Sequence, residues 1–135
     1  VTGNHVSDCA FSAIRANQAS NIQITSNQAI RSGETAVYAE FSFEGAVIAS
    51  NLIDGGAVGI SVANFNEGGR LAAVSGNIIR NLTTQGPYPA EYAGFGIGIA
   101  IEADFEWPNG GRSIYFRDPA GNSIELADPA IWAES

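Results

Sequence analysis

Lysine and methionine are both missing from this sequence of 135 residues. All six cationic side chains are arginines, and 14 aspartates and glutamates give the chain a formal charge of −8. A chain so poor in cations offers no basic patch for the phosphates of nucleic acid or for an anionic membrane surface. The composition therefore predicts that neither nucleic acid nor an anionic membrane is a partner.

Cysteine, histidine and long apolar runs are equally scarce. Cys9 is the single cysteine, so the chain cannot form an internal disulfide, and we favour a small buried residue over a reactive thiol. No apolar run approaches the roughly 18 residues of a membrane helix, so no membrane span is expected. No signal peptide is visible, and the sequence pattern is already under way at Val1. The chain is therefore expected to be a fragment or a fusion.

Asparagine recurs at regular intervals through the first part of the chain. Asn4, Asn27, Asn51 and Asn77 are separated by 23, 24 and 26 residues. Apolar residues keep fixed positions around them, and three residues before the asparagines stand Val1, Ile24, Ile48 and Val74. Such a period is typical of a stacked solenoid, because one repeat cannot bury its own apolar face.

The residue types at these positions decide between two kinds of solenoid. A leucine-rich repeat needs leucine at fixed positions, whereas here valine, isoleucine and alanine fill them. The sequence therefore predicts an all-β fold, a right-handed parallel β-helix of about four coils over residues 1–105. We expect the asparagines to be structural and to hydrogen-bond from coil to coil. The open ends of such a solenoid are a route to self-association.

Two insertions interrupt the repeat, at residues 63–70 and 83–96. The second insertion carries the ligand-contact candidates Tyr88, Glu91, Tyr92 and Phe95. Aromatic rings beside a carboxylate are typical of a sugar-binding surface, and loops on one side of a solenoid often form its binding face. The alternative, which we favour, is a loop that folds its aromatic rings over the adjacent coils.

The segments SDCAFSAIRAN, ISVANFNEGGRLA and GNIIRNLTT carry a resemblance to a known family. The chain from Val1 to about Ala103 resembles Tat-exported bacterial proteins with repetitive right-handed parallel β-helix repeats. The resemblance implies the fold and export to the periplasm or the exterior, and it implies no reaction.

From Glu106 onward the pattern changes. Residues 113–117 and 122–127 are two alternating segments, and Asp118 to Asn122 between them form a turn signal with proline and glycine. We therefore expect an antiparallel hairpin, which would cover the open end of the solenoid. The run WPNGGRSIYFRDPAGNSIELADPAIW resembles the end of a vicinal-oxygen-chelate domain, the glyoxalase, bleomycin-resistance and dioxygenase superfamily.

That second resemblance implies that Glu125 is a metal ligand, because the family has a glutamate in its final strand. A catalytic divalent ion generally needs three protein ligands, and the only histidine, His5, belongs to the repeat. We favour a solvated strand residue for Glu125 and expect no cofactor. A divalent metal would bind only if another chain completed the site.

The two resemblances divide the chain into residues 1–105, the β-helix repeats, and residues 106–135, the hairpin and tail. They meet without a linker, which suggests a chimera by gene fusion, by joined fragments or by an assembly artefact.

Catalytic chemistry has only weak candidates in this sequence. Enzymes built on β-helices cleave acidic polysaccharides with clustered carboxylates and a basic residue. The nearest equivalents here are Glu44, Glu67 and Arg70, with Glu40 and Asp54 as further carboxylates. We favour the view that Arg70 only neutralises its neighbours. The most consistent function is a non-catalytic scaffold or a carbohydrate-contacting module, and the alternatives are a polysaccharide-active enzyme and an incomplete metal-dependent enzyme.

Overall fold

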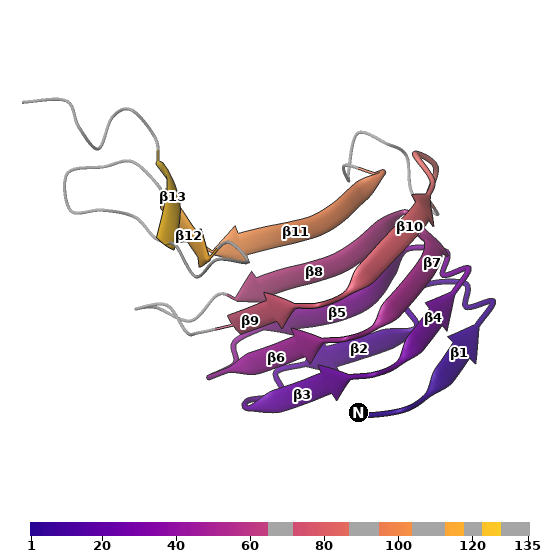
Figure 1. Ribbon diagram of the computed structural model, residues 1–135, viewed down its shortest axis with the longest axis horizontal. Helices are drawn as coiled ribbons and strands as arrows, with labels where there is room; N and C mark the ends of the chain where they lie inside the picture. Colours follow the sequence, from indigo (N-terminus) through magenta and orange to yellow (C-terminus); the bar gives the residue numbers. More distant parts are fainter. Residues whose placement is uncertain (65–71, 87–94, 104–112, 118–122, 128–135) are drawn as a thin grey trace, which may run out of the picture.

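The computed structural model of the chain describes residues 1–64, 72–86, 95–103, 113–117 and 123–127. Side chains are described as far as Ile101, and beyond it only the backbone of the described strands is considered. Every regular element in these ranges is a β-strand, so the prediction of an all-β chain is confirmed for them (Figure 1). The described residues contain no helix that is long and apolar enough to cross a membrane.

Eleven strands form three parallel sheets. The first sheet contains β1 (His5–Ser7), β4 (Gln28–Ile30), β7 (Leu52–Gly56) and β10 (Ile78–Leu82). The second sheet contains β2 (Ile14–Asn17), β5 (Thr35–Phe41), β8 (Val58–Asn64) and β11 (Ile97–Ala103). The third sheet contains β3 (Ile22–Thr25), β6 (Ala46–Ala49) and β9 (Ala72–Ser75). The chain enters the sheets in turn, so each strand pairs with the strand three places later.

The predicted right-handed β-helix of about four coils is wrong. The strands form separate parallel sheets of four, four and three strands, and they do not form one clear solenoid. The physical reason lies at the corners, where residues with left-handed backbone turn the chain sharply. At the asparagine corner the Asn27 N–H donates to Asn51 Oδ1 and not to a backbone carbonyl, so the backbone ladder is interrupted between the third sheet and the first.

Left-handed residues occupy equivalent places in successive repeats. One directly precedes each of the four asparagines: Gly3, Ser26, Ser50 and Gly76. Another follows each asparagine by four residues: Asp8, Arg31, Gly55 and Asn81. Most of these residues are not glycine, although a non-glycine residue with positive φ is uncommon.

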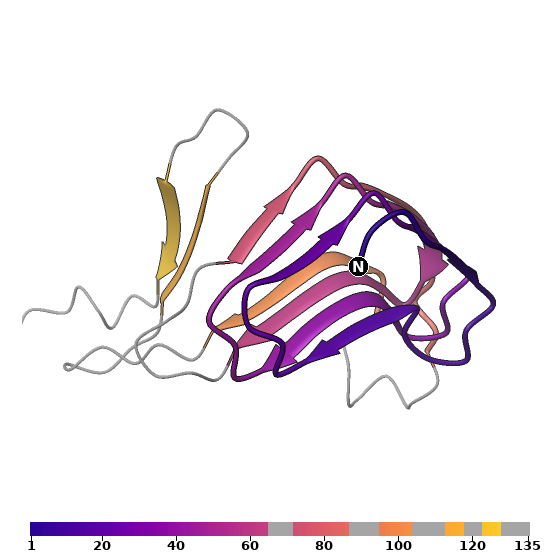
Figure 2. The same ribbon diagram turned by 90° about the horizontal axis from the view of Figure 1, so that it is seen from below.

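The interior is filled by side chains that repeat from strand to strand. In the third sheet, Ile24, Ile48 and Val74 are register partners, and both isoleucines are fully buried. In the second sheet, Val37 and Ile60 pair in the same way and are also buried. Burial of each such side chain contributes roughly 1.5–3 kcal/mol. The core therefore lies between the three sheets (Figure 2).

The four asparagines form one continuous hydrogen-bonded row, which confirms their predicted structural role. Asn4 Nδ2 donates to Asn27 Oδ1 at 2.9 Å, and Asn27 Nδ2 donates to Asn51 Oδ1 at 3.0 Å. Asn51 Nδ2 donates in turn to Asn77 Oδ1 at 2.9 Å. The backbone N–H of each of the first three asparagines also donates to the Oδ1 atom of the next asparagine in the row. The row therefore has one polarity from end to end.

The C-terminal strands β12 (Ser113–Arg117) and β13 (Ser123–Ala127) pair antiparallel, with Tyr115 opposite Glu125. This pairing confirms the predicted hairpin strands, and the expected turn at residues 118–122 lies outside the described residues. In Figures 1 and 2 the two strands lie beside the three parallel sheets. They do not lie across the open end, so the expectation that the hairpin covers this end is not met.

Candidate functional site

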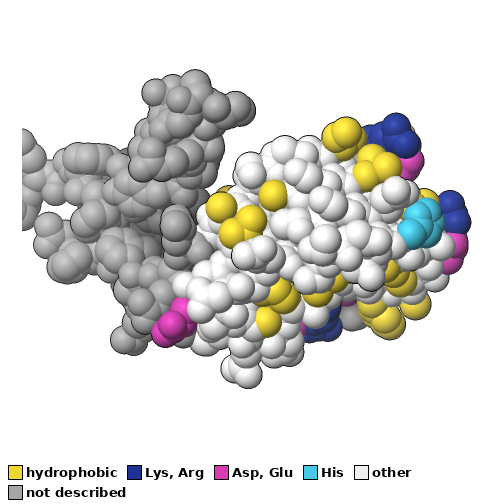
Figure 3. All heavy atoms as spheres, turned by 60° about the horizontal axis from the view of Figure 1, so that its bottom comes forward, with side chains coloured by type: hydrophobic (Ala, Val, Ile, Leu, Met, Phe, Trp, Pro, Cys, Tyr) yellow, Lys and Arg dark blue, Asp and Glu magenta, His cyan; other side chains and the backbone are white. Residues whose placement is uncertain are grey.

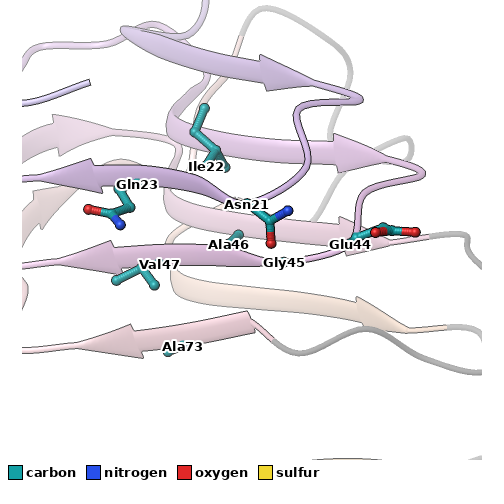
Figure 4. Close-up of a pocket in the computed structure, with 8 residues that line it drawn as sticks. All are labelled: Asn21, Ile22, Gln23, Glu44, Gly45, Ala46, Val47 and Ala73. Atoms are coloured by element: carbon teal, nitrogen blue, oxygen red, sulfur yellow. The ribbon is translucent and has the colours of Figure 1, made fainter.

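A shallow depression lies on the outer surface of the third sheet (Figure 4). Gln23, Val47 and Ala73 are register partners on β3, β6 and β9, and all three side chains are exposed. They lie on the face opposite Ile24 and Ile48, because successive side chains of a strand point to opposite faces. Further lining residues of the depression are Asn21, Ile22, Glu44, Gly45 and Ala46.

Backbone hydrogen bonds hold the polar rim of this depression in place. The Ile22 N–H donates to the Gly45 carbonyl at 3.2 Å, which ties the start of β3 to the start of β6. The Glu44 N–H donates to Ser20 Oγ at 2.9 Å. Asn21 adopts a left-handed backbone with φ of 56°. The corner between the second and third sheets therefore positions Asn21 and Glu44 at one border of the depression.

The depression combines polar and apolar groups in a way that suits a polyhydroxylated ligand. The amides of Asn21 and Gln23 each carry both donors and acceptors, and an ionised Glu44 only accepts. Val47 is 38% exposed and, with Ala73, supplies the apolar part of the surface. Nothing in this set is a nucleophile next to a general base, so the arrangement fits contact better than catalysis.

The arginines with described side chains are all engaged with carboxylates. Arg31 Nη2 lies 2.6 Å from Asp8 Oδ2, and Arg80 Nη2 lies 2.8 Å from Asp54 Oδ2. Figure 3 shows arginine side chains against acidic ones along one edge of the molecule, near the single histidine. Hydrogen bonds from Arg31 and then Ser7 lower the pKa of Asp8.

Glu40 is the most buried of these carboxylates and lies on the outer side of the second sheet. Its side chain is 4% exposed, and it binds the guanidinium of Arg15, whose Nη2 lies 3.0 Å from Glu40 Oε2. The Arg15 guanidinium also stacks over the Tyr38 ring, 5.6 Å from its centroid. Hydrogen bonding to Glu40 raises the pKa of Arg15. This pair joins β2 to β5, and its charges neutralise each other.

The carboxylates considered as catalytic candidates do not converge. Glu40 belongs to the second sheet and Asp54 to the first, whereas Glu44 lies at the corner before the third sheet. Glu67 and Arg70 lie outside the described residues, so the predicted proximity of Glu67 to Glu44 stays a prediction.

Of the aromatic loop candidates, only Phe95 falls within the described residues. Its ring packs on the backbone of Gly86, where an added Cβ would lie 2.4 Å from the nearest ring carbon. Phe95 is half-buried, which suits a loop that folds its aromatic ring over neighbouring chain. Tyr88, Glu91 and Tyr92 lie outside the described residues.

The metal candidates lie in different elements. Glu125 belongs by its backbone to β13, and His5 belongs to β1, where its Nδ1 lies 3.1 Å from Gln28 Oε1. The part of the chain with described side chains contains no group of three or more histidine, cysteine, aspartate or glutamate residues able to hold a metal ion. Cys9 is half-buried, and its Sγ lies 3.9 Å from the Ser7 carbonyl oxygen.

Sequence reasoning found Glu44 but missed the depression that it borders. The available signal was the spacing of Gln23 and Val47, which each precede one of the repeated inward isoleucines. No family model matches the chain, and no curated protein and no solved structure matches it either. The family resemblances seen in the sequence therefore stay predictions.

Proposed function

We propose that this chain is a non-catalytic module whose outer face on the third sheet contacts carbohydrate. The depression lined by Asn21, Gln23, Glu44, Val47 and Ala73 carries this proposal. In line with the resemblance of its repeats, the module belongs to an exported bacterial protein. It also associates with itself through the open ends of its sheets.

The chemistry of a sugar ring supports this face. The hydroxyl groups of a sugar both donate and accept, as do the amides of Asn21 and Gln23. The C–H face of the ring is apolar and matches Val47 and Ala73. Because the depression is shallow, it buries little of the ligand, and binding is expected to be weak, with Kd on the order of 1 mM.

The charge of the chain favours a neutral carbohydrate. The formal charge is −8, and Arg15, Arg31 and Arg80 are each held by a carboxylate. An acidic polysaccharide would meet electrostatic repulsion over most of this surface. This argument separates the proposal from the alternative of an enzyme acting on acidic polysaccharides.

Two alternative functions, a polysaccharide-active enzyme and a metal-dependent enzyme, can each be tested separately. Calcium-dependent cleavage of an acidic polysaccharide, abolished by Glu67→Ala, would establish the enzyme that uses the region of Glu44, Glu67 and Arg70. Stoichiometric binding of a divalent metal, lost in Glu125→Gln, would establish the vicinal-oxygen-chelate alternative. We expect neither result.

The direct test is calorimetric titration of the chain with neutral oligosaccharides selected on a glycan array. Gln23→Ala is expected to weaken binding about tenfold, which corresponds to roughly 1.4 kcal/mol for the lost amide contacts. The matched control is Gln28→Ala, because Gln28 is an exposed glutamine on the outer side of β4 in the first sheet. Binding that is weakened equally by both variants, or by neither, would contradict this location.

A further inference from the structure

The two open ends of the parallel sheets are unequal and complementary. One end consists of Val1–Gly3 with β1 and β2, and we call it the leading end. The other consists of β9, β10 and β11, and we call it the trailing end. We propose that the trailing end of one copy of this chain stacks on the leading end of a second copy, in the register that the sheets already use. This inference deepens the proposed self-association and does not depend on the carbohydrate face.

The trailing end exposes side chains that the fold buries elsewhere. Ile99 is 46% exposed and Ile101 is 36% exposed, although their register partners on β8, Ile60 and Val62, are buried. The next strand in the same register would continue these two rows. On the leading end of a second copy, Ile14 and Ala16 occupy those positions, because they pair with Val37 and Ala39 on β5. Stacking would therefore cover isoleucine with apolar side chains.

The asparagine row supplies a direction for this stacking. Each of Asn4, Asn27 and Asn51 donates its backbone N–H to the side-chain oxygen of the next asparagine, and Asn77 is the last asparagine of the row within the described residues. A second copy would place Asn4 Oδ1 beside the Asn77 N–H, in the position that Asn77 Oδ1 takes beside the Asn51 N–H. The Asn27 and Asn51 side chains also donate to the carbonyls of Val1 and Ile24, respectively, in the preceding repeats.

At the leading end, the Asn4 amide donates to the Thr2 carbonyl, two residues before it, at 3.2 Å. Continuation of the row would give Asn4 the Val74 carbonyl of the neighbouring copy, because Ile24, Ile48 and Val74 share one register position. Stacking would thus give the Asn4 side-chain amide a carbonyl acceptor at the trailing end and give the Asn77 N–H an amide acceptor at the leading end.

Charges on the first sheet support the same direction. Arg80 lies on the trailing strand β10, paired with Asp54 on β7. Asp8 follows the leading strand β1. Stacking in register would place Asp8 of the second copy diagonally from Arg80. Within one chain, Arg31 lies diagonally from Asp54 in the same way, because Ile30 is the register partner of Asp54.

Leading and trailing ends that fit each other do not close into a pair. Each added copy presents a new trailing end, so the interaction is heterologous and builds linear assemblies. The exposed backbone of β11 supplies the hydrogen bonds of an unpaired strand edge. The partner is therefore a second copy of this chain, which presents a parallel strand edge with matching apolar rows and charges.

A cysteine pair tests both the contact and its direction. His5, Gln28, Leu52 and Ile78 share one register position, so stacking places Ile78 of one copy about 4.8 Å from His5 of the next. This spacing suits a disulfide. In a Cys9→Ala background, a mixture of His5→Cys chains and Ile78→Cys chains is expected to form disulfide-linked heterodimers. A disulfide within either single-variant sample, or a monomer without cross-links in the mixture, would overturn the proposal.

Ile99→Asp provides the second measurement, by sedimentation over a dilution series of the full chain. The substitution places a charge in the exposed apolar row and is expected to abolish association. Val47→Asp is the matched control, since Val47 is 38% exposed on the outer face of β6. Val47→Asp is expected to weaken carbohydrate binding and to leave association unchanged, so failure of either proposal is recognised separately. Equal association of the Ile99→Asp variant and the wild-type chain would overturn the stacking.

Discussion

At the scale of single residues, the asparagine row contributes most in the middle and least at its ends. Asn51 is 2% exposed, and its Oδ1 accepts from the Asn27 N–H at 2.9 Å and from Asn27 Nδ2 at 3.0 Å. Its Nδ2 also donates to the Ile24 carbonyl at 2.9 Å. Asn4, by contrast, is exposed at the leading end. An asparagine side chain is therefore expected to contribute more to the free energy of unfolding at position 51 than at position 4.

Asn51→Ala is expected to lower the free energy of unfolding by about 3 kcal/mol, because it leaves several buried polar groups without partners. Asn4→Ala, which removes donors near solvent, is expected to cost less than about 1 kcal/mol. Urea unfolding of both variants measures the difference. Equal losses would show that the row does not stabilise the chain through its buried hydrogen bonds.

Backbone conformation at the corner before Asn77 allows a second test at residue scale. Gly76 has a φ of 62°, and a Cβ there would meet only Ser50 atoms, at 3.7 and 3.9 Å. Gly76→Ala is therefore expected to cost about 1 kcal/mol through its left-handed backbone alone. Gly98→Ala is the control, because a Cβ at Gly98 meets nothing within 4 Å and its φ is not left-handed. Thermal unfolding that shows equal losses for both would contradict this explanation.

At the scale of elements, polar contacts join neighbouring strands on the outer surface. Asp54 on β7 accepts from Asn81 Nδ2 at 2.7 Å and from Arg80 Nη2 at 2.8 Å, and both donors belong to β10. The hydrogen bonds from Asn81 and then Arg80 lower the pKa of Asp54. A carboxyl whose pKa is lower in the folded chain stabilises that state only while it is ionised.

Protonation of Asp54 is therefore expected to weaken the link between β7 and β10. Its contribution is present above the pKa of an aspartate in the unfolded chain, about 3.9, and is lost as the pH falls through the lower folded value. Asp54→Asn should be less stable than the wild-type chain at pH 7, and the difference should shrink towards pH 2. Unfolding midpoints at the two pH values measure it, and a difference that does not change with pH would contradict the role of the charge.

The pairing of strands could be predicted, but the separation of the sheets could not. Ile24, Ile48 and Val74 share a register position because inward positions demand apolar side chains in every repeat. The corners are different, since residues as unlike as Ser26 and Arg31 adopt the same left-handed backbone. These residue types carry no common signal for that conformation, so the sequence did not show where the parallel sheets would break.

The candidate site was predictable only in part, for a related reason. Glu44 stood out as a carboxylate next to the repeat, whereas Gln23, Val47 and Ala73 occupy outward positions that tolerate almost any side chain. Outward positions do not repeat one residue type from strand to strand. That they form a common surface can be recognised only when the strand register is known. The catalytic candidates were grouped by sequence spacing, which does not report that Glu40 and Asp54 belong to different sheets.

At the scale of the whole molecule, the proposed carbohydrate face and the two ends are different surfaces. The outer face of the third sheet runs alongside the stacking direction, and Gln23, Val47 and Ala73 follow one another along it. Stacking of a second copy would leave this face uncovered and would extend it. A weak site repeated along a linear assembly gains avidity towards a polymeric ligand without any new contact. The proposed self-association and the proposed carbohydrate contact would therefore reinforce each other.

The central claim is that the outer face of the third sheet contacts neutral carbohydrate. Titration of the isotope-labelled chain with a neutral oligosaccharide, followed by amide chemical shifts, tests it residue by residue. We expect the largest shifts at Gln23, Val47 and Ala73 and at their neighbours Asn21 and Glu44, with His5 and Gln28 unchanged. Shifts confined to residues 87–94, or no shifts with any neutral oligosaccharide, would contradict the claim.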